Sequence, residues 1–181
     1  MSKTRSGLSR YTIGLPILLF IVLAVAVPNF TETRNLANIS AQITALLIVT
    51  LGQLVVALIA GIDLSVGSVM SLASCIVATH ADPVWGITLA LTLGVVVGLV
   101  NGIGVAFANI HPLVMTLSSM TFLQGLAYLI LPIPGGQVAA GLGVLANGSL
   151  WGIPQSLFWC ALFTALVAWL LHRSQIGRAH V

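Results

Sequence analysis

Long apolar runs, separated by short segments rich in turn-forming residues, dominate the chain. A hydrocarbon core of about 30 Å needs about 20 apolar residues in a helix, and six segments approach that length. They lie at 12–28, 40–60, 66–81, 84–106, 113–131 and 155–172. The pattern predicts an all-α, polytopic membrane protein: a transmembrane helix bundle of about six spans that forms one permease-like domain over residues 1–175.

Composition supports a membrane protein and not a soluble one. Hydrophobic residues make up 59% of the chain and charged residues 5%, whereas soluble domains carry about 25% charged residues. The basic residues Lys3, Arg5 and Arg10 precede the first segment, and Arg173 and Arg178 follow the last. Basic residues mark cytoplasmic ends, so we expect both ends in the cytoplasm. We also expect the lipid bilayer as the surroundings and no nucleic-acid partner.

An acidic residue interrupts the apolar pattern where the second and third segments meet. Asp63 stands between Gly61 and Gly67, with Ser65 and Ser68 beside it. These residue types stop one helix and cap the next, so we predict a broken helix near residues 61–68 with Asp63 or Ser65 as the cap. Broken helices also line solute paths in transporters. An alternative function for the carboxylate is a proton or cation site.

The fourth segment carries three glycines spaced every four residues: Gly94, Gly98 and Gly102. Glycines on one helix face let two helices approach closely, so this stripe predicts helix packing. Asn101 beside it is expected either to bond across helices or to line a path. With Thr116 and Gln124, it completes the set of path-lining candidates.

The sequence lacks the residues that ATP binding, metal binding and acid–base catalysis require. Lys3 is the only lysine, so the chain has no P-loop for ATP. The four histidines are far apart and form no metal motif, and no helix carries paired carboxylates. We therefore expect no metal site and no enzyme activity, which leaves transport, conduction or scaffolding.

The string GIDLSVGSVMSL, residues 61–72, closely resembles the signature of permease subunits of the ribose/xylose/autoinducer-2 class of bacterial ABC sugar importers. The family's usual form is G-G-I-D-L-S-V-G-S, with Ala60 here in place of the first glycine. Other family-like elements follow in order over about residues 30–178. They are Phe30 with Asn35-Leu36 and Asn38-Ile39, Gly98 with Asn101-Gly102, His111 to Leu117, Gln124 to Ala127 with Gln124 where arginine is common, and Gly152-Ile153-Pro154.

The resemblance implies one subunit of an ATP-driven sugar importer in the bacterial cytoplasmic (inner) membrane. Its partners would be an ABC ATPase subunit, a second permease subunit in a homo- or heterodimer, and a periplasmic or lipoprotein solute-binding protein. The chain would need no cofactor of its own, since the partner ATPase binds ATP. Outside this resemblance, a secondary transporter or channel subunit that uses Asp63, or a membrane scaffold, remains open.

The last residues resemble the start of the family's ATPase-contact stretch, with Gly177-Arg178 in the matching place. The string IGRAHV is also one reading frame of a widely used sequencing adapter. We therefore expect residues 176–181 to be either a truncation point or an adapter-derived tail.

Overall fold

The computed structural model describes residues 5–133 and 135–174, most of which are helical. The elements are α1 (Arg5–Ala26), α2 (Thr33–Leu58), α3 (Val66–Thr79), α4 (Pro83–Ala106), α5 (Pro112–Ile130), α6 (Ala140–Asn147), β1 (Ser149–Leu150), β2 (Ile153–Pro154) and α7 (Gln155–Arg173). Each of the six predicted segments coincides with a helix, which confirms the all-α architecture. By length and composition, α2, α4, α5 and α7 can each cross a membrane, whereas α3 and the Gly14–Ala26 part of α1 are shorter apolar helices.

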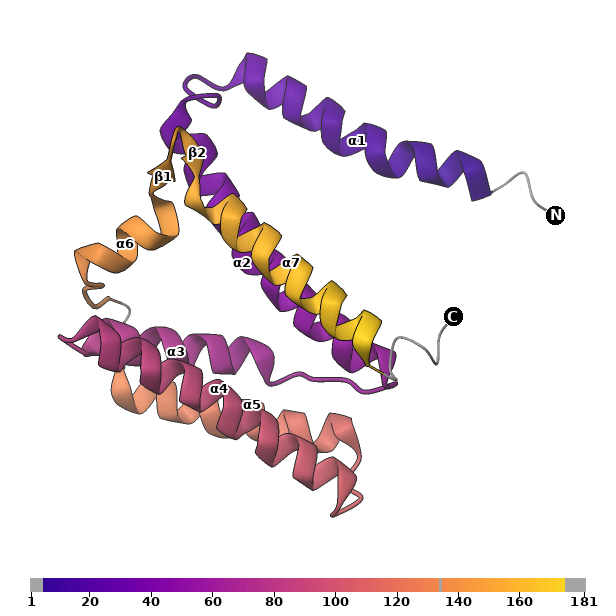
Figure 1. Ribbon diagram of the computed structural model, residues 1–181, viewed down its shortest axis with the longest axis vertical. Coiled ribbons are helices and arrows are strands. Elements are labelled where there is room, and N and C mark those ends of the chain that lie inside the picture. The colour runs from indigo at the N-terminus through magenta and orange to yellow at the C-terminus, as the bar shows by residue number, and fades with distance from the viewer. Residues whose placement is uncertain (1–4, 134, 175–181) are drawn as a thin grey trace.

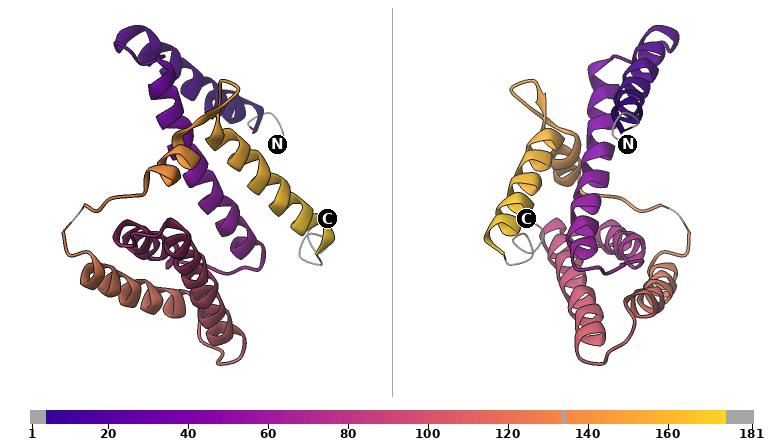
Figure 2. Two further views of the ribbon diagram at one scale, coloured as in Figure 1. Left: turned by 60° about the vertical axis from the view of Figure 1, so that its left-hand side comes forward. Right: turned by 90° about the vertical axis from the view of Figure 1, so that its right-hand side faces the viewer.

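Apart from α1, which stands off to one side, the helices form two packed groups (Figure 1). In one group α3 packs against both α4 and α5, and in the other α2 packs along α7 with α6 and the β1–β2 hairpin beside them. Figure 2 shows the same two groups from two further sides. The buried apolar core lies in the first group and consists of Leu72 of α3, Val97 of α4, and Leu123 and Ala127 of α5. Most other large apolar side chains face outward, as expected where lipid surrounds the helices.

The helix directions agree with alternating membrane crossings. The Thr44 hydroxyl, early in α2, donates to the carbonyl oxygen of Ser156 at the start of α7 (3.1 Å), so these two helices run parallel. The Leu64 N–H, just before α3, donates to the hydroxyl of Thr116 near the start of α5 (3.2 Å), so α3 and α5 also run parallel. Six alternating spans require both of these relations.

Two residue pairs that end in proline mark helix starts. The Asp82 carboxylate accepts hydrogen bonds from two backbone N–H groups of the first turn of α4, where Pro83 is the first helical residue. His111 does the same for α5, since its Nδ1 accepts from the N–H of Leu113 (3.3 Å) and Pro112 follows it. The Asp-Pro and His-Pro pairs therefore fix where the fourth and fifth spans begin.

The region at 132–154 differs from the loop that the sequence predicted. It contains α6 and a two-stranded hairpin in which Ser149 pairs with Pro154 and Leu150 with Ile153. The hairpin turn is Trp151-Gly152, with φ values of +52° and +80°. Positive φ at both central residues is typical of a type I′ turn. A tryptophan at such a position is uncommon, so residues 149–154 carry no hairpin signal in the sequence.

The C-terminus of α2 is a Schellman motif built without the usual glycine. The N–H of Gly61 donates to the carbonyl oxygen of Val56, and the N–H of Ala60 donates to that of Ala57, both at 3.0 Å. Ala60 takes the left-handed conformation of this motif, with φ +56°. The position at which this chain departs from the family pattern is therefore one where the backbone favours glycine.

We expect Ala60→Gly to stabilise the protein by about 0.5–1 kcal/mol. The substitution removes a left-handed alanine but adds freedom to the unfolded chain, which offsets part of the gain. Denaturant unfolding in detergent micelles measures the difference. As a control, Ala57→Gly lies inside α2 and should instead destabilise by about 1 kcal/mol. An Ala60→Gly protein no more stable than the parent would contradict the assignment of strain.

The charge placement and helix directions give a topology that reporter fusions can check. Fusions after Asn35 in α2 and Gly143 in α6 should report an outside location, because both follow an odd number of crossings. Fusions after Ile110 and Ser174 should report the cytoplasm. An outside signal at Ser174 would show that the number of crossings is wrong.

Candidate functional site

The predicted break is present and takes the form of a seven-residue non-helical connection. α2 ends at Leu58, α3 begins at Val66, and Ile59–Ser65 between them is not helical. Non-helical backbone at membrane depth is tolerated only where protein or a water-filled cavity covers it. Cover comes first from α2 itself, since Nε2 of Gln53 donates to the carbonyl oxygen of Asp63 (2.7 Å).

Thr116 of α5 supplies further partners for the same backbone. Its hydroxyl oxygen accepts from the N–H of Leu64 at 3.2 Å. Its proton is shared between the carbonyl oxygens of Ile62 at 3.3 Å and Pro112 at 2.9 Å. Thr116 is only 4% exposed, so its hydroxyl serves the connection and is not open to a solute path.

A chain of four polar side chains joins this connection, just before α3, to α4 and α5. We call Asp63, Ser65, Asn101 and Ser119 the Asp63 network. Oδ1 of Asp63 accepts from the N–H (2.8 Å) and the hydroxyl (2.6 Å) of Ser65. Nδ2 of Asn101 donates to the Ser65 hydroxyl oxygen (3.1 Å), and the Ser119 hydroxyl donates to Oδ1 of Asn101 (2.5 Å).

Because the Asp63 network is buried, its hydrogen bonds contribute to the stability of the fold. Ser65 is 1% exposed and Asn101 is 7% exposed, so an unbonded polar atom at either residue would be costly. Both ends of the Asn101 amide are used, one towards α3 and one towards α5. Asn101 therefore bonds across helices, one of its two predicted roles, and its burial does not favour a path-lining position.

The predicted cap needs a correction in detail. Ser65 occupies the N-cap position of α3, but its side chain accepts no hydrogen bond from the helix backbone. Asp63 instead holds the N–H of Ser65 itself. Gly61 is tightly placed, since an added Cβ would lie 3.0 Å from a side-chain atom of α2, while Gly67 has open space around it. Ser68 is buried in the first turn of α3.

The glycine stripe on α4 has no described helix against it, so its predicted packing role stays a prediction. An added Cβ at Gly94, Gly98 or Gly102 would meet no atom within 4 Å, so no described helix lies close against them. The close contact is at Gly104, where an added Cβ would lie 2.7 Å from Sδ of Met115 in α5. The packed face of α4 is thus a different one, because spacing alone does not say which face meets a neighbour.

Gln124 lies apart from the Asp63 network, in a cavity of about 250 Å³ between α3 and α5. We call it the α3–α5 cavity. It is lined by Ser71, Cys75, Gln124, Ala127, Tyr128, Leu131 and Pro132. Of the three path-lining candidates, Gln124 is the one exposed in the described structure.

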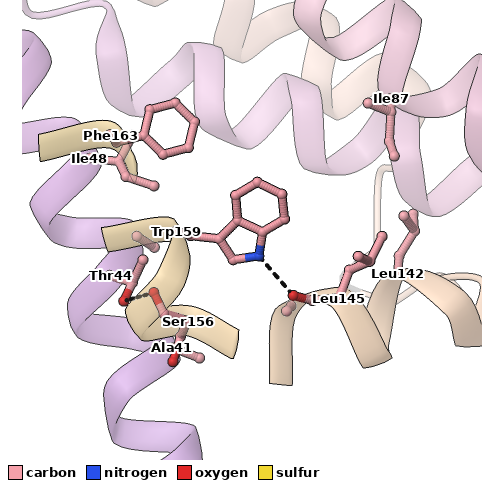
Figure 3. A pocket seen from close by; sticks show the side chains of 11 residues that line it. Ala41, Thr44, Ile48, Ile87, Leu142, Leu145, Ser156, Trp159 and Phe163 are labelled. Atoms are coloured by element: carbon pink, nitrogen blue, oxygen red, sulfur yellow. Dashed lines mark hydrogen bonds between the residues drawn. The ribbon is translucent and has the colours of Figure 1, made fainter. Parts of the chain in front are cut away.

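A larger and more apolar cavity, of about 400 Å³, lies where α2, α6 and α7 meet (Figure 3). Its few polar groups are used between elements: the Trp159 indole N–H donates to the carbonyl oxygen of Leu145 (3.0 Å), and Thr44 bonds to Ser156. Ile87 of α4 closes it from the other helix group. The cavity therefore belongs to the packing between helices.

Two further expectations from the sequence concern the C-terminal residues and metal binding. Gly177 and Arg178, the expected start of an ATPase contact, lie outside the described residues. Among residues 5–133 and 135–174, no group of three or more His, Cys, Asp or Glu side chains is placed to hold a metal ion.

Substitutions at Asp63 distinguish a structural role, in which its carboxylate bonds Ser65, from a role as a proton or cation site. Asp63→Asn keeps an oxygen acceptor for Ser65, so we expect a loss of less than about 1 kcal/mol in unfolding free energy. Asp63→Leu leaves the buried Ser65 N–H without a partner and should cost about 1–3 kcal/mol. Unfolding in micelles and solute uptake are measured together. If both variants lose uptake completely and equally, while Asp63→Asn keeps its stability, the result would favour a proton or cation site.

Comparison with known proteins places the chain in a family. The family model described as branched-chain amino acid transport system / permease component matches residues 35–181. The ribose import permease protein RbsC of Bacillus subtilis (strain 168) is 33% identical over 173 residues, which covers 92% of this chain and 53% of that protein. RbsC of Escherichia coli (strain K12) is 33% identical over 176 residues, covering 92% and 54%.

A galactose/methyl galactoside import permease protein, MglC of Salmonella typhimurium, is 28% identical over 193 residues and covers 91% of this chain and 57% of its own. No solved structure matches. The chain spans about half the length of these curated relatives. The resemblance to ribose-type import permeases that the sequence motifs carried is confirmed. With the family model matching residues 35–181, the chain belongs to the family of branched-chain amino acid transport system permease components.

Proposed function

We propose that the chain is a membrane-spanning subunit of an ATP-driven importer for a sugar or a related small polar solute. The observation that carries this proposal is the similarity to ribose import permeases over 92% of the chain. The fold supports it, because a polytopic helix bundle with a protein-covered break is an arrangement that solute transporters use. A multi-pass position in the bacterial cytoplasmic membrane follows from the same proposal.

The choice of a sugar over an amino acid rests on charge. The family description names branched-chain amino acids, whereas the relatives' names refer to ribose and galactose. An amino acid carries an ammonium and a carboxylate group, and charges away from water need charged or strongly hydrogen-bonding partners. α3, α4 and α5 contain no charged residue, and Asp63 before them is bonded to Ser65. A neutral solute suits this surface better.

Energy and solute delivery would come from partners. The sequence has no P-loop lysine, so ATP would be bound by a separate ABC ATPase subunit and this chain would need no cofactor. A second permease subunit would complete the path, and a periplasmic or lipoprotein binding protein would deliver the solute. Gly177-Arg178 would begin the ATPase contact.

The alternative of a secondary transporter that uses Asp63 is less well supported by the geometry. Oδ1 of Asp63 already accepts two hydrogen bonds from Ser65 within the Asp63 network. A proton or cation carrier needs a carboxylate that exchanges its partner during each cycle. The observed bonds instead hold the start of α3 in place.

The test is uptake by the importer assembled from the natural gene and its neighbours. The gene is expressed with the adjacent ATPase and binding-protein genes in a strain that lacks ribose and galactose uptake. We expect uptake of labelled ribose or galactose that stops when ATP is depleted or when the P-loop lysine of the ATPase is replaced. Leucine uptake without sugar uptake would contradict the solute class. Sugar uptake that survives ATP depletion would contradict the importer and favour a secondary transporter.

A further inference from the structure

The α3–α5 cavity has an unusual lining for a face among membrane helices. Ser71 and Cys75 lie one turn apart on α3, and Gln124 and Tyr128 lie one turn apart on α5, so each pair shares a helix face. The buried core residue Ala127 forms part of the wall between the two pairs. A hydroxyl, a thiol, an amide and a phenol are therefore gathered in about 250 Å³.

The polar groups of this cavity lack protein partners among the described residues. Several hydroxyl groups on the same helices donate to the carbonyl oxygen four residues earlier, as Ser74 does to Met70 and Thr121 does to Leu117. Within the described residues, the side chains of Ser71 and Gln124 make no hydrogen bond. An amide left unbonded in hydrocarbon costs several kcal/mol, on the order of 4–8 by transfer to an alkane. This face is therefore unsuited to lipid.

The depth of Gln124 in the span excludes the explanation that its amide reaches headgroups or water at the membrane surface. It lies twelve residues after Pro112, the first residue of α5, or about 18 Å along the helix at 1.5 Å per residue. It is thus within the span and cannot reach headgroups or water past the helix end. Tyr128 lies one turn nearer the end that the topology places outside, so a solute entering from outside would meet the tyrosine and then the amide.

The chemistry of the lining selects a neutral polyhydroxylated ligand. The amide of Gln124 both donates and accepts hydrogen bonds, and the Ser71 hydroxyl does the same. The Tyr128 ring offers an apolar face with a polar tip. No charged side chain lines the cavity. Sites for drug-sized ligands begin at about 300 Å³, so this cavity suits a smaller molecule such as a monosaccharide.

We propose that the α3–α5 cavity is a sugar-binding surface of the solute path, with Gln124 and Ser71 bonding sugar hydroxyls and Tyr128 covering the apolar face of the ring. This inference rests on the proposed function. The competing occupant is a helix of another subunit that bonds Gln124 directly. The lining favours a solute, because it offers a hollow with several separate polar groups and not a flat small-residue surface.

Thiol labelling tests whether water reaches the cavity. In the assembled importer with Cys160→Ala, Cys75 is the remaining cysteine of this chain, and a charged methanethiosulfonate reagent is added to cells. A thiol reacts as its thiolate, which forms in water and not in lipid, so Cys75 should react roughly ten times faster than a reference cysteine in lipid. The reference is Phe122→Cys with Cys75→Ala and Cys160→Ala, ten residues after Pro112 in α5, where Phe122 is 67% exposed and apolar. Equal rates would overturn the proposal.

Solute protection and uptake kinetics then test the ligand. Saturating ribose with the binding protein should slow Cys75 labelling roughly threefold, and a sugar that is not transported should not. Gln124→Leu and Ser71→Ala should each raise the KM for ribose uptake roughly three- to tenfold, the worth of one lost hydrogen bond. The matched controls are Thr121→Val and Ser74→Ala, whose hydroxyl groups bond their own helices, and their KM should stay within about twofold.

The outcomes separate this inference from the proposed function. If the parent importer carries ribose, but Cys75 is unprotected and both KM values are unchanged, the cavity is not the sugar site and the function stands. If Gln124→Leu separates the subunits in native gels and Thr121→Val does not, Gln124 bonds another helix and the inference is wrong. If the parent importer carries no sugar, the proposed function fails and the ligand class named here fails with it.

Discussion

The structure depends on one constraint: backbone polar groups inside a bilayer must find partners within the protein. Helices meet this constraint alone, but Ile59–Ser65 is not helical. Its N–H and carbonyl groups are bonded instead by Gln53 from α2, Thr116 from α5 and the Asp63 carboxylate. The placement of α5 against α3 follows from this requirement, because Thr116 must reach the connection. Gln53, Thr116 and Asp63 are therefore polar side chains placed where the non-helical backbone needs hydrogen-bond partners.

Asn101 extends the same bonds into α4. One amide group donates towards α3 and accepts from α5, so the three helices are fixed together at one end by polar bonds. At the other levels Leu72, Val97 and Leu123 pack as an ordinary apolar core. Hydrogen bonds need their donor and acceptor at set distances and angles, so a shift of one helix along another would break them. The hydrogen bonds at the polar end therefore set the register of the three helices, and apolar packing stabilises the remainder of their contact.

The sequence predicted the lengths of the helices and the position of the helix break, but not which residues from different helices contact one another. The six apolar helices could be predicted because apolar length is a local property, and the break could be predicted from Gly61, Asp63 and Ser65 because stop and cap residues act locally. The pairing of Leu64 with Thr116 crosses 52 positions, and no spacing rule connects them. The glycine stripe meets no described helix for a related reason, since regular spacing identifies a face and not its neighbour. Ser119 and Gln53 stood among many polar residues with nothing to single them out.

The short length of α3 has a mechanical consequence. Its 14 residues span about 21 Å, against about 30 Å for the hydrocarbon core. Three extended residues rise about 10 Å, so the connection before α3 supplies the missing length with half the residues a helix would need. The ladder of helical hydrogen bonds stops at this point. An axial push on α3 is therefore carried sideways into α4 and α5, which share its buried polar bonds, more directly than back into α2, which precedes it in the chain.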